Sequence, residues 1–430
     1  MKSYRFYAMT FFILASLITM IIGCKYDVAE PLWNSPPANS TEVTITSIDP
    51  AAATPGVNII TINGTNLSNA LDSTRIIKRY NDTLVIYDST FVYNGIYFDN
   101  VQATVISSSP TMIKVFRPNV VSNNCTIKIA SDKALAVAKF GPYKIDAVME
   151  PFGSFVANVP LSSISLDNAG NLYVAETNTQ YLWKITPNGD KTQIMTETGG
   201  STALVMKAVS SDLKISPVDG KLYYTTSIFP KTKYVQIMDL NSPTVKMDSI
   251  ALTKNVICCD FAANGYLYAG GRRSGIQIIR PDRSLRNDGY YATDTISSMR
   301  VFKGYVYVST RHGIWRHSLS DTSLVGAPEL VLDLTQGMLA SLPVKAFSFT
   351  ADGTKLYIGT DSQYPILVAD ATSLPIPLSK VDIVYKGILP SYCKQFSFGN
   401  YLYAIIGNAI PAVNWLVYKI DVGATGAPYY

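Results

Sequence analysis

Residues 167–175 read Asp-Asn-Ala-Gly-Asn-Leu-Tyr-Val-Ala, a turn followed by an apolar strand. The Leu-Tyr pair, or a Val-Tyr variant, recurs six times, at Leu172-Tyr173, Leu222-Tyr223, Leu267-Tyr268, Val306-Tyr307, Leu356-Tyr357 and Leu402-Tyr403. Successive tyrosines are 50, 45, 39, 50 and 46 residues apart. A period of about 40–50 residues is typical of a β-propeller blade of four short strands. One blade cannot bury both of its faces, so we expect six blades to close into a ring over residues 147–430.

In each repeat a turn containing Gly or Asn precedes the Leu-Tyr strand, and a third strand follows it, as at Leu182 to Ile185. After Ile420 little chain is left for the fourth strand of the sixth blade. The sequence therefore leaves two ways in which the ring could be closed. The tail through Tyr430 supplies the missing strand, or a segment near Tyr143 to Glu150 does.

The phrase at 167–175 and the blade lengths resemble NHL-type and SMP-30-like six-bladed propellers. This resemblance implies either a protein-interaction scaffold or a lactonase- or lyase-like enzyme with a divalent metal at the channel. The innermost strands disfavour the metal, and they begin with Ser162, Lys207, Asn255, Ser297, Lys345 and Lys394. A set so poor in carboxylates does not suit a hard cation, so we expect no metal and no cofactor.

The N-terminus has the features of a targeting segment. Lys2 and Arg5 precede an apolar run from Ala8 to Ile22, too short for a membrane span of about 20 residues. Ile21-Ile22-Gly23-Cys24 resembles a lipobox, which implies a lipoprotein signal peptide over 1–23 and acylation of Cys24. The Pro- and Asn-rich residues 24–41 would then form a lipidated tether. Its acidic residues resemble the export signal of surface lipoproteins in Bacteroidetes, so we expect an outer-membrane, cell-surface location.

Residues 42–146 predict a first β domain. Its order of motifs includes Ile48-Asp49-Pro50, a turn at Asn63-Gly64, and the strand phrase 109–115. This order resembles the IPT/TIG domain, a small immunoglobulin-like sandwich, with an insertion at about 68–94 and Asp99 where that family usually has Gly. The predicted fold class is therefore all-β, an IPT/TIG sandwich followed by a six-bladed propeller.

The charge composition of the chain limits the classes of partner it can bind. The chain carries 36 basic and 31 acidic residues, and removal of the signal segment lowers the basic count to 34. Basic residues do not cluster with aromatic ones, so we expect no nucleic-acid partner. Cys125, Cys258, Cys259 and Cys393 have neither zinc nor disulfide spacing, and we expect buried free thiols.

The loops between the second and third strands of each blade should emerge on one face, where propellers offer a ligand site. These loops carry aromatic, amide and charged side chains, a mixture suited to a sugar. The candidates are Glu176, Tyr181, Tyr234, Arg272, Arg273, Arg311, His312, Asp361, Tyr364, Asn414 and Trp415. Lys345 and Lys394 occupy equivalent positions near the channel mouth, where they could attract an anionic ligand such as a uronate or simply end their strands.

The lipobox, tether, IPT/TIG module and propeller together resemble surface glycan-binding lipoproteins of polysaccharide-utilisation systems. We therefore expect non-catalytic capture of an oligo- or polysaccharide on the propeller loop face. The resemblance also implies membrane attachment through the lipid anchor and an outer-membrane transporter as partner. A protein-interaction scaffold and a metal-dependent lactonase or lyase are the alternatives.

Overall fold

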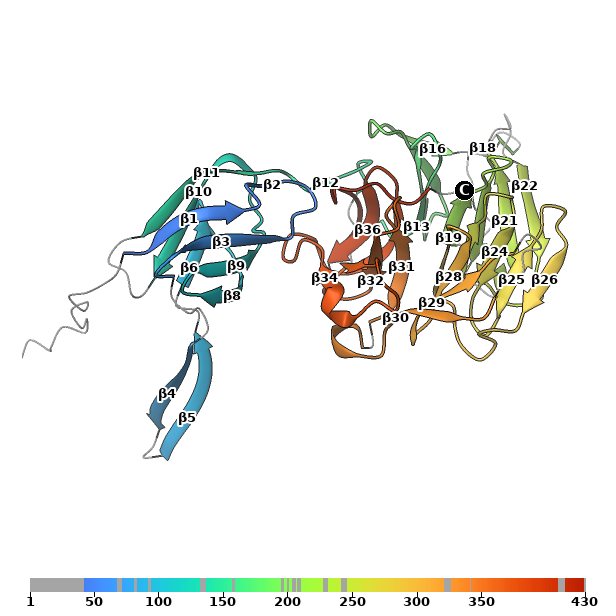
Figure 1. The fold of residues 1–430 in the computed structure, drawn as a ribbon. Helices are drawn as coiled ribbons and strands as arrows, with labels where there is room; N and C mark the ends of the chain where they lie inside the picture. Colours follow the sequence, from blue (N-terminus) through green and yellow to red (C-terminus); the bar gives the residue numbers. More distant parts are fainter. Residues whose placement is uncertain are drawn as a thin grey trace, which may run out of the picture.

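The computed structural model (Figure 1) describes residues 42–67, 72–80, 83–91, 94–131, 137–156, 159–194, 197–198, 201–202, 206, 210–226, 231–240, 246–320, 326–340, 342–408 and 414–428. The predicted signal peptide (1–23), Cys24 and the predicted tether (24–41) lie outside this part of the chain. The described residues form an immunoglobulin-like sandwich and a six-bladed propeller, so the predicted fold class is confirmed.

The first domain packs two sheets face to face. One sheet contains β1 (Thr44–Asp49), β3 (Ile59–Thr65), β9 (Met112–Phe116) and β8 (Val105–Ser109), in that order. The other contains β2 (Ala52–Ala53), β11 (Ala138–Ile145), β10 (Ser122–Ser131), β6 (Asn94–Phe98) and β7 (Val101–Gln102). Alternate residues of β3 and β9, such as Ile60, Ile62 and Ile113, are fully buried between the sheets. Period-two burial of this kind is expected for strands with one face in a core.

The predicted insertion contains a long antiparallel hairpin, β4 (Asp72–Tyr80) and β5 (Thr83–Phe91). It is a separate two-stranded sheet, and it projects away from the sandwich in Figure 1.

Six four-stranded antiparallel sheets form the propeller, each described here from its innermost strand outward. Blade one contains β13 (Leu161–Leu166), β14 (Leu172–Glu176), β15 (Leu182–Ile185) and β16 (Lys191–Ile194). Blade two contains β19 (Ser210–Ile215), β20 (Leu222–Thr226), β21 (Tyr234–Asp239) and β22 (Lys246–Ala251). Blade three contains β23 (Cys258–Phe261), β24 (Leu267–Gly270), β25 (Ile276–Ile279) and β26 (Leu285–Asp288).

Blade four contains β27 (Ser298–Phe302), β28 (Tyr305–Ser309), β29 (Gly313–Ser318) and β30 (Glu329–Asp333). Blade five contains β31 (Val344–Phe349), β32 (Lys355–Thr360), β33 (Ile366–Asp370) and β34 (Val381–Ile383). Blade six contains β35 (Cys393–Phe398), β36 (Leu402–Asn408), β37 (Asn414–Ile420) and β12 (Met149–Pro151). The short elements outside the blades are β17 (Glu197–Thr198), β18 (Ser201–Thr202), η1 (Lys231–Lys233), η2 (Gly337–Leu339) and η3 (Leu378–Lys380).

Each innermost strand contacts the innermost strand of the next blade, and β35 contacts β13, so the ring is closed. The recurring Leu-Tyr pair lies in the second strand of every blade. Its tyrosine packs between blades: Tyr223 meets Phe261, Tyr307 meets Phe349, and Tyr357 meets Phe398, with ring centroids 4.6–5.1 Å apart. Each of these phenylalanines ends the innermost strand of the following blade. The sequence repeat is therefore a repeat of blade-to-blade packing.

The fourth strand of blade six comes from the N-terminal side of the propeller. Strand β12 pairs antiparallel with β37, with Met149 opposite Ile420 and Pro151 opposite Tyr418. The C-terminal tail instead crosses the hairpins next to the channel, where Thr350 and Gly426 form an isolated bridge. Of the two closures left open by the sequence, the structure has the one near Glu150.

The four cysteines of the described chain are free and buried, as predicted. Cys258 and Cys259 point to different blade interfaces, since they belong to separate apolar clusters. Burial raises the pKa of both thiols well above its usual range, which keeps them protonated and unreactive.

A buried ion pair fills the hairpin end of the channel. The guanidinium of Arg300 on β27 lies 2.7 Å from the carboxylate of Asp260 on β23, and both side chains are at most 2% exposed. Arg300 also donates to the carbonyl oxygens of Ala427 and Pro428, at 3.0 and 2.6 Å. This one side chain therefore joins blade three, blade four and the C-terminal tail.

The sandwich and the propeller meet at Tyr385, which follows β34. Its hydroxyl accepts a hydrogen bond from the amide of Gly56 at 2.7 Å and donates to the carbonyl of Asp421 at 2.5 Å. Its own amide donates to the side chain of Asn58 at 3.0 Å, and the guanidinium of Arg117 lies 5.7 Å from its ring centroid. Because Tyr385 is 1% exposed, these contacts replace solvent and hold the two domains against each other.

Replacing Arg300 with methionine leaves the buried Asp260 carboxylate without its cation, so we expect the free energy of unfolding to fall by about 3–5 kcal/mol. Urea-induced unfolding measures this, with Arg286→Met on exposed β26 as the control that stays within about 0.5 kcal/mol. The paired variant Arg300→Met/Asp260→Leu should recover part of the loss. An equal loss in the single and paired variants would contradict a role for the charge pair.

Replacing Tyr385 with phenylalanine removes the hydroxyl between Gly56 and Asp421, and we expect a loss of about 1–3 kcal/mol because both groups lose a buried partner. Thermal unfolding reports the stability, and small-angle scattering reports a wider spread of domain orientations. Tyr357→Phe is the matched control, since the hydroxyl of Tyr357 has no hydrogen bond to any described residue. If the two variants behave alike, the Tyr385 hydroxyl does not hold the interface.

Candidate functional site

The propeller has two faces with different connections. We call the face with the connections between second and third strands, and between blades, the loop face. The face with the turns between first and second strands is the hairpin face. The sequence placed its candidate ligand residues on the loop face.

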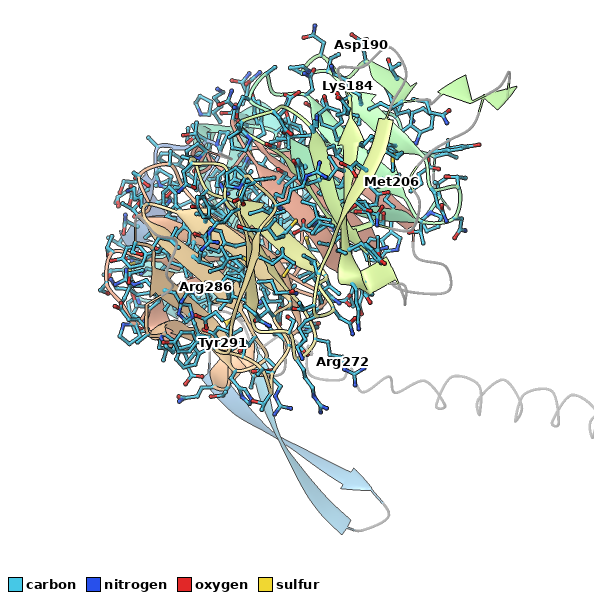
Figure 2. All side chains as sticks on the ribbon, turned by 90° about the vertical axis from the view of Figure 1, so that its right-hand side faces the viewer. Lys184, Asp190, Met206, Arg272, Arg286 and Tyr291 are labelled. Atoms are coloured by element: carbon cyan, nitrogen blue, oxygen red, sulfur yellow. The ribbon has the colours of Figure 1, made fainter. Side chains whose placement is uncertain are left out.

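A cavity of about 610 Å³ opens on the loop face over blades three to five. The loop between the second and third strands of blade three supplies Arg272 and Arg273, and the equivalent loop of blade four supplies Arg311. Lys345 is the second residue of β31. The connections between blades supply the remaining wall, which includes Thr293, Asp294, Thr295, Ser297, Leu342 and Pro343. The structure therefore brings three of the predicted arginines together around one cavity. Arg272 and Arg286 lie at separate places on blade three in Figure 2.

Backbone contacts hold the arginine-bearing loop in one shape. The amide of Arg273 donates to the carbonyl of Asp294 at 2.8 Å, and Arg272 bridges to Thr295. The hydroxyl of Ser274 accepts from the amide of Gly271 at 2.7 Å. Arg273 itself has a φ of +51°, an uncommon conformation for a side chain of this size. Such backbone strain is concentrated at functional sites, where surrounding contacts enforce it.

The cavity carries an excess of positive charge. Arg272, Arg273 and Arg311 are exposed, and none of them forms an ion pair with the described part of the chain. Lys345 pairs with Asp361 at 3.3 Å, and both side chains are about 40% exposed. Among the described residues that line the cavity, Asp294 is the one acidic side chain.

Lys394 adds a further cation on the blade-six side of the channel mouth. Burial lowers the pKa of its ammonium group, and the nearby charge of Lys345 lowers it further. Its ammonium donates to the carbonyl of Leu161 at 2.5 Å and lies 5.4 Å from the ring centroid of Trp415. The two lysines that the sequence placed at this mouth thus lie near each other, and Lys394 already has partners.

The aromatic candidates do not line the cavity. Tyr234 begins β21 and is 38% exposed, whereas Tyr364 is half-buried against the apolar cluster of blades four and five. Tyr181 lies edge-on to Trp183, with ring centroids 6.4 Å apart. Trp415 is half-buried against the cluster between blades six and one. Arginine and aromatic side chains that the sequence grouped together are therefore on separate blades of the face.

Of three other candidate ligand residues, two hydrogen-bond to nearby side chains and the third has a side chain outside the described part. The buried carboxylate of Glu176 accepts hydrogen bonds from the indole of Trp183, at 2.7 Å, and from the hydroxyl of Thr179. The ring of His312 accepts a hydrogen bond from Arg311 at 2.9 Å. Asn414 begins β37, and its side chain lies outside the described part.

Beneath the channel mouth, polar side chains cross from one innermost strand to another. The amide nitrogen of Gln395 donates to buried Asp212 at 2.6 Å, and its oxygen accepts from the amide of Ile164 at 2.8 Å. Asp212 also accepts from the amide of Cys259 at 3.0 Å. A space of about 30 Å³ is left, which suits a water molecule rather than a ligand.

In the described part of the chain, no group of three or more His, Cys, Asp or Glu side chains has the arrangement to hold a metal ion. No helix in that same part is long and apolar enough to cross a membrane.

Nothing in the sequence indicated that the connections between blades line this cavity. Their lining residues fall within 293–297 and 342–344. These segments have no repeated motif. Their place in the cavity depends on how neighbouring blades pack.

Comparison with known proteins supports the architecture. Residues 43–140 match the family model of the IPT/TIG domain, so the predicted IPT/TIG domain is confirmed. No curated protein matches the chain.

Several solved structures are similar to the chain. An auxiliary nutrient binding protein from Bacteroides ovatus ATCC 8483 is 12% identical, with a TM-score of 0.47 over 88% of this chain and 98% of that chain. Another from Bacteroides thetaiotaomicron VPI-5482 is 10% identical, with a TM-score of 0.46 over 88% and 97%. A luciferin-regenerating enzyme is 13% identical, with a TM-score of 0.51 over 66% of this chain and 98% of that chain. At this identity, the similarity to the last protein shows the propeller fold alone.

The second histidine of the chain, His317, generates a prediction about pH. It is fully buried, its Nδ1 donates to the carbonyl of Gly326 at 2.6 Å, and its Nε2 accepts from the hydroxyl of Tyr291 at 2.7 Å. Burial lowers the pKa of the imidazole, which outweighs the opposing effects of the Gly326 carbonyl and of Asp288. In the unfolded chain the same group titrates near pH 6.5.

As the pH falls through about 6.5, the unfolded chain therefore binds a proton that the folded chain does not, and the free energy of unfolding should decrease. Denaturant unfolding between pH 7.5 and 5.0 measures this slope. We expect a flatter slope in His317→Gln and an unchanged one in His312→Gln, whose ring is exposed. Identical slopes in the wild type and His317→Gln would assign the pH dependence to other groups.

Proposed function

We propose that this protein captures an acidic glycan on the loop face of its propeller and does not turn it over. The observation that carries the proposal is the cavity of about 610 Å³ lined by Arg272, Arg273 and Arg311, whose guanidinium groups have no carboxylate partner in the described part. Its size is within the range of small-ligand sites.

The chemistry of the wall favours an anionic sugar over a neutral one. A guanidinium binds a carboxylate or sulfate through two parallel hydrogen bonds, and this geometry suits uronic acids and sulfated sugars. Hydroxyl groups of Thr293, Thr295 and Ser297 are suited to the hydroxyls of the same sugar. The described lining contains no aromatic ring, so stacking would contribute little at this cavity.

Binding without turnover also agrees with the titratable groups present. Hydrolysis of a glycosidic bond usually requires two carboxyl groups about 5–10 Å apart. Among the described residues that line the cavity, Asp294 is the one carboxylate, and it already accepts a hydrogen bond from the amide of Thr295 at 2.7 Å.

The N-terminal sequence supports display at the cell surface. The lipobox-like segment ending in Cys24 and the Pro-rich residues 24–41 suit an acylated, tethered outer-membrane protein. In this proposal the IPT/TIG domain is a spacer, and captured glycan passes to an outer-membrane transporter.

Calorimetry with oligogalacturonate tests the proposal, using a chain that begins after Cys24. We expect saturable binding that weakens about tenfold in Arg272→Ala or Arg311→Ala, because each removes a charge-assisted hydrogen bond. Binding should also weaken as NaCl rises from about 50 to 300 mM, since exposed charges are screened.

Arg286→Ala is the matched control, since it removes the same charge from exposed β26 outside the cavity. Heparin-derived oligosaccharides extend the test to sulfated sugars. If neither acidic probe binds, or if Arg286→Ala weakens binding as much as Arg272→Ala, the proposal is wrong.

A further inference from the structure

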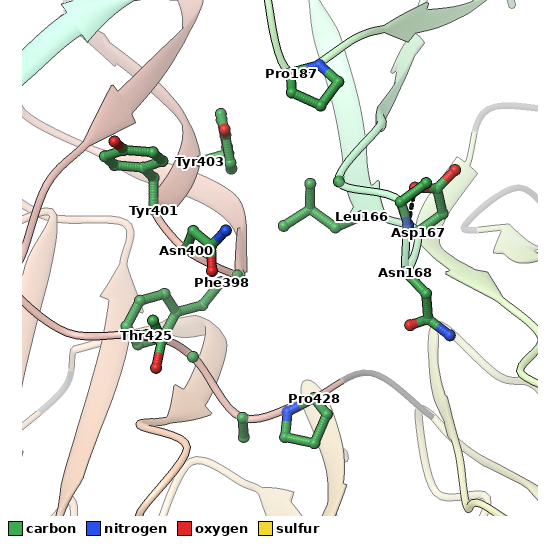
Figure 3. Close-up of a pocket in the computed structure, with 15 residues that line it drawn as sticks. Leu166, Asp167, Asn168, Pro187, Phe398, Asn400, Tyr401, Tyr403, Thr425 and Pro428 are labelled. Carbon is green, nitrogen blue, oxygen red and sulfur yellow. Dashed lines mark hydrogen bonds between the residues drawn. The ribbon is translucent and has the colours of Figure 1, made fainter.

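A second cavity, of about 340 Å³, opens on the hairpin face, on the side of the propeller opposite to the arginines. It lies between the first turn of blade one, at Asp167 to Gly170, and the first turn of blade six, at Gly399 to Tyr401 (Figure 3). Residues Thr425 to Pro428 of the C-terminal tail form its third side. This is the seam where the last blade meets the first.

The described wall of this cavity carries one charged side chain and no cation. Asp167 is its one ionisable carboxylate, and both of its oxygens are occupied. One accepts from the amides of Ala169 and Asn171, at 3.0 and 2.8 Å. The other accepts from the side chain of Asn171 at 2.9 Å and from the hydroxyl of Tyr173 at 3.2 Å. A ligand here would meet one hydrogen-bonded carboxylate and no cation, unlike a ligand of the arginine-lined cavity.

Tyr401 supplies the main flat apolar surface. Its ring is half-buried and is held edge-on against Tyr403, with centroids 6.3 Å apart. The ammonium of Lys419 lies 4.3 Å from the ring centroid. Lys419 lines an adjoining hollow of about 210 Å³ that Tyr401 also borders, so it covers the ring from that side. The ring is thereby oriented before any ligand arrives.

Two exposed amides stand on opposite walls of the cavity. Asn168 belongs to the turn of blade one and Asn400 to that of blade six, and Figure 3 draws them on either side of the gap. Neither amide group has a hydrogen bond to another residue that the structure describes. Each offers two donors and one acceptor.

The walls belong to tight turns that cannot shift freely. Gly426 passes so close to β35 that a Cβ at this position would lie 2.2 Å from the carbonyl oxygen of Phe398. Its amide donates to the carbonyl of Gly399 at 2.7 Å, and the next amide, of Ala427, donates to Phe349 at 2.8 Å. The tail is thus fixed to the ring next to the cavity.

We propose that this seam cavity is a second carbohydrate site, selective for neutral pyranose sugars. A pyranose ring has an apolar C–H face, which suits the flat ring of Tyr401, and hydroxyls at its edge, which suit the amides of Asn168 and Asn400. The described lining residues offer no cation to an acidic sugar, and the carboxylate of Asp167 would repel one, so a neutral sugar is favoured. The proposal goes beyond the acidic-glycan site and does not depend on it.

The same strand position in other blades provides the comparison. Tyr305 precedes β28's Val306-Tyr307 as Tyr401 precedes Leu402-Tyr403, and a cation also covers its ring, with Arg316 at 4.4 Å from the centroid. Tyr305 does not line the seam cavity. Substituting it therefore removes an equivalent side chain and leaves the proposed site intact.

The experiment is ligand-observed NMR followed by calorimetry on the chain that begins after Cys24. The probes are four neutral pentasaccharides: cellopentaose, maltopentaose, xylopentaose and mannopentaose. We expect saturable binding of at least one probe, weakened about tenfold in Tyr401→Ala and unchanged in Tyr305→Ala. Arg272→Ala should also leave this affinity unchanged, which separates this site from the arginine-lined cavity.

Asn168→Ala and Asn400→Ala test the same site without removing the Tyr401 ring, in case Tyr401→Ala destabilises the blade. Both asparagine side chains are exposed, so their loss should not affect folding. Each should weaken binding severalfold with no change in thermal unfolding. If none of the four probes binds, or if binding persists in Tyr401→Ala and in both asparagine variants, the seam cavity is not a carbohydrate site.

Discussion

The pairing of β12 with β37 is the contact on which the propeller depends. A ring of blades is stable only if its last blade is completed, because an unfinished blade leaves an open sheet edge and an exposed face. Here three residues next to the first domain complete the ring, and Lys419 on β37 pairs with Glu150 on β12 at 2.9 Å. Since β11 ends at Ile145 and β12 begins at Met149, closure of the ring also sets the position of the sandwich. Tyr385 then holds that position through its hydrogen bonds with Gly56 and Asn58 of the sandwich.

The two faces of the ring differ in chemistry, and the channel between them is filled. On the loop face, loops with little regular structure present arginines to solvent. On the hairpin face, tight turns present amides and a tyrosine. The channel between the two faces is filled by the side chains of Asp212 and Gln395 and by the Arg300–Asp260 pair. The C-terminal tail covers the end of the channel on the hairpin face. Because buried charged groups must keep their partners, this interior is expected to stay closed, and each face would bind its ligand independently.

Local patterns located three of the side chains that line the arginine cavity. Arg272, Arg273 and Arg311 follow the second strands of consecutive blades, and equivalent loops of neighbouring blades necessarily emerge side by side. The same logic began the innermost strand of blade three at Asn255, whereas β23 begins at Cys258, and its predicted start for blade two, Lys207, lies outside the described residues. It also could not say that Trp415 would be half-buried beside Lys394 or that Glu176 would bind Trp183. Those contacts depend on side-chain directions within single loops, which have no repeat to reveal them. Tyr401 was assigned no role from sequence, because it precedes the Leu402-Tyr403 pair, which has the pattern of core residues.

The repeat of a Leu-Tyr strand after a Gly or Asn turn was sufficient to establish the number of blades, since each Leu-Tyr pair marks the second strand of one blade. Composition and motif order were likewise sufficient for an all-β chain with an IPT/TIG sandwich at its start. Only the tertiary structure decided which segment closes the ring, which loops share a cavity, and which carboxylates are already hydrogen-bonded. These features depend on contacts between residues more than a hundred positions apart, such as Gln395 with Ile164 and Arg300 with the tail, and on the space left between blades after packing. Neither the long-range contacts nor the space between blades can be predicted from the local pattern of residues, because the free energy of such contacts arises only once the ring has formed.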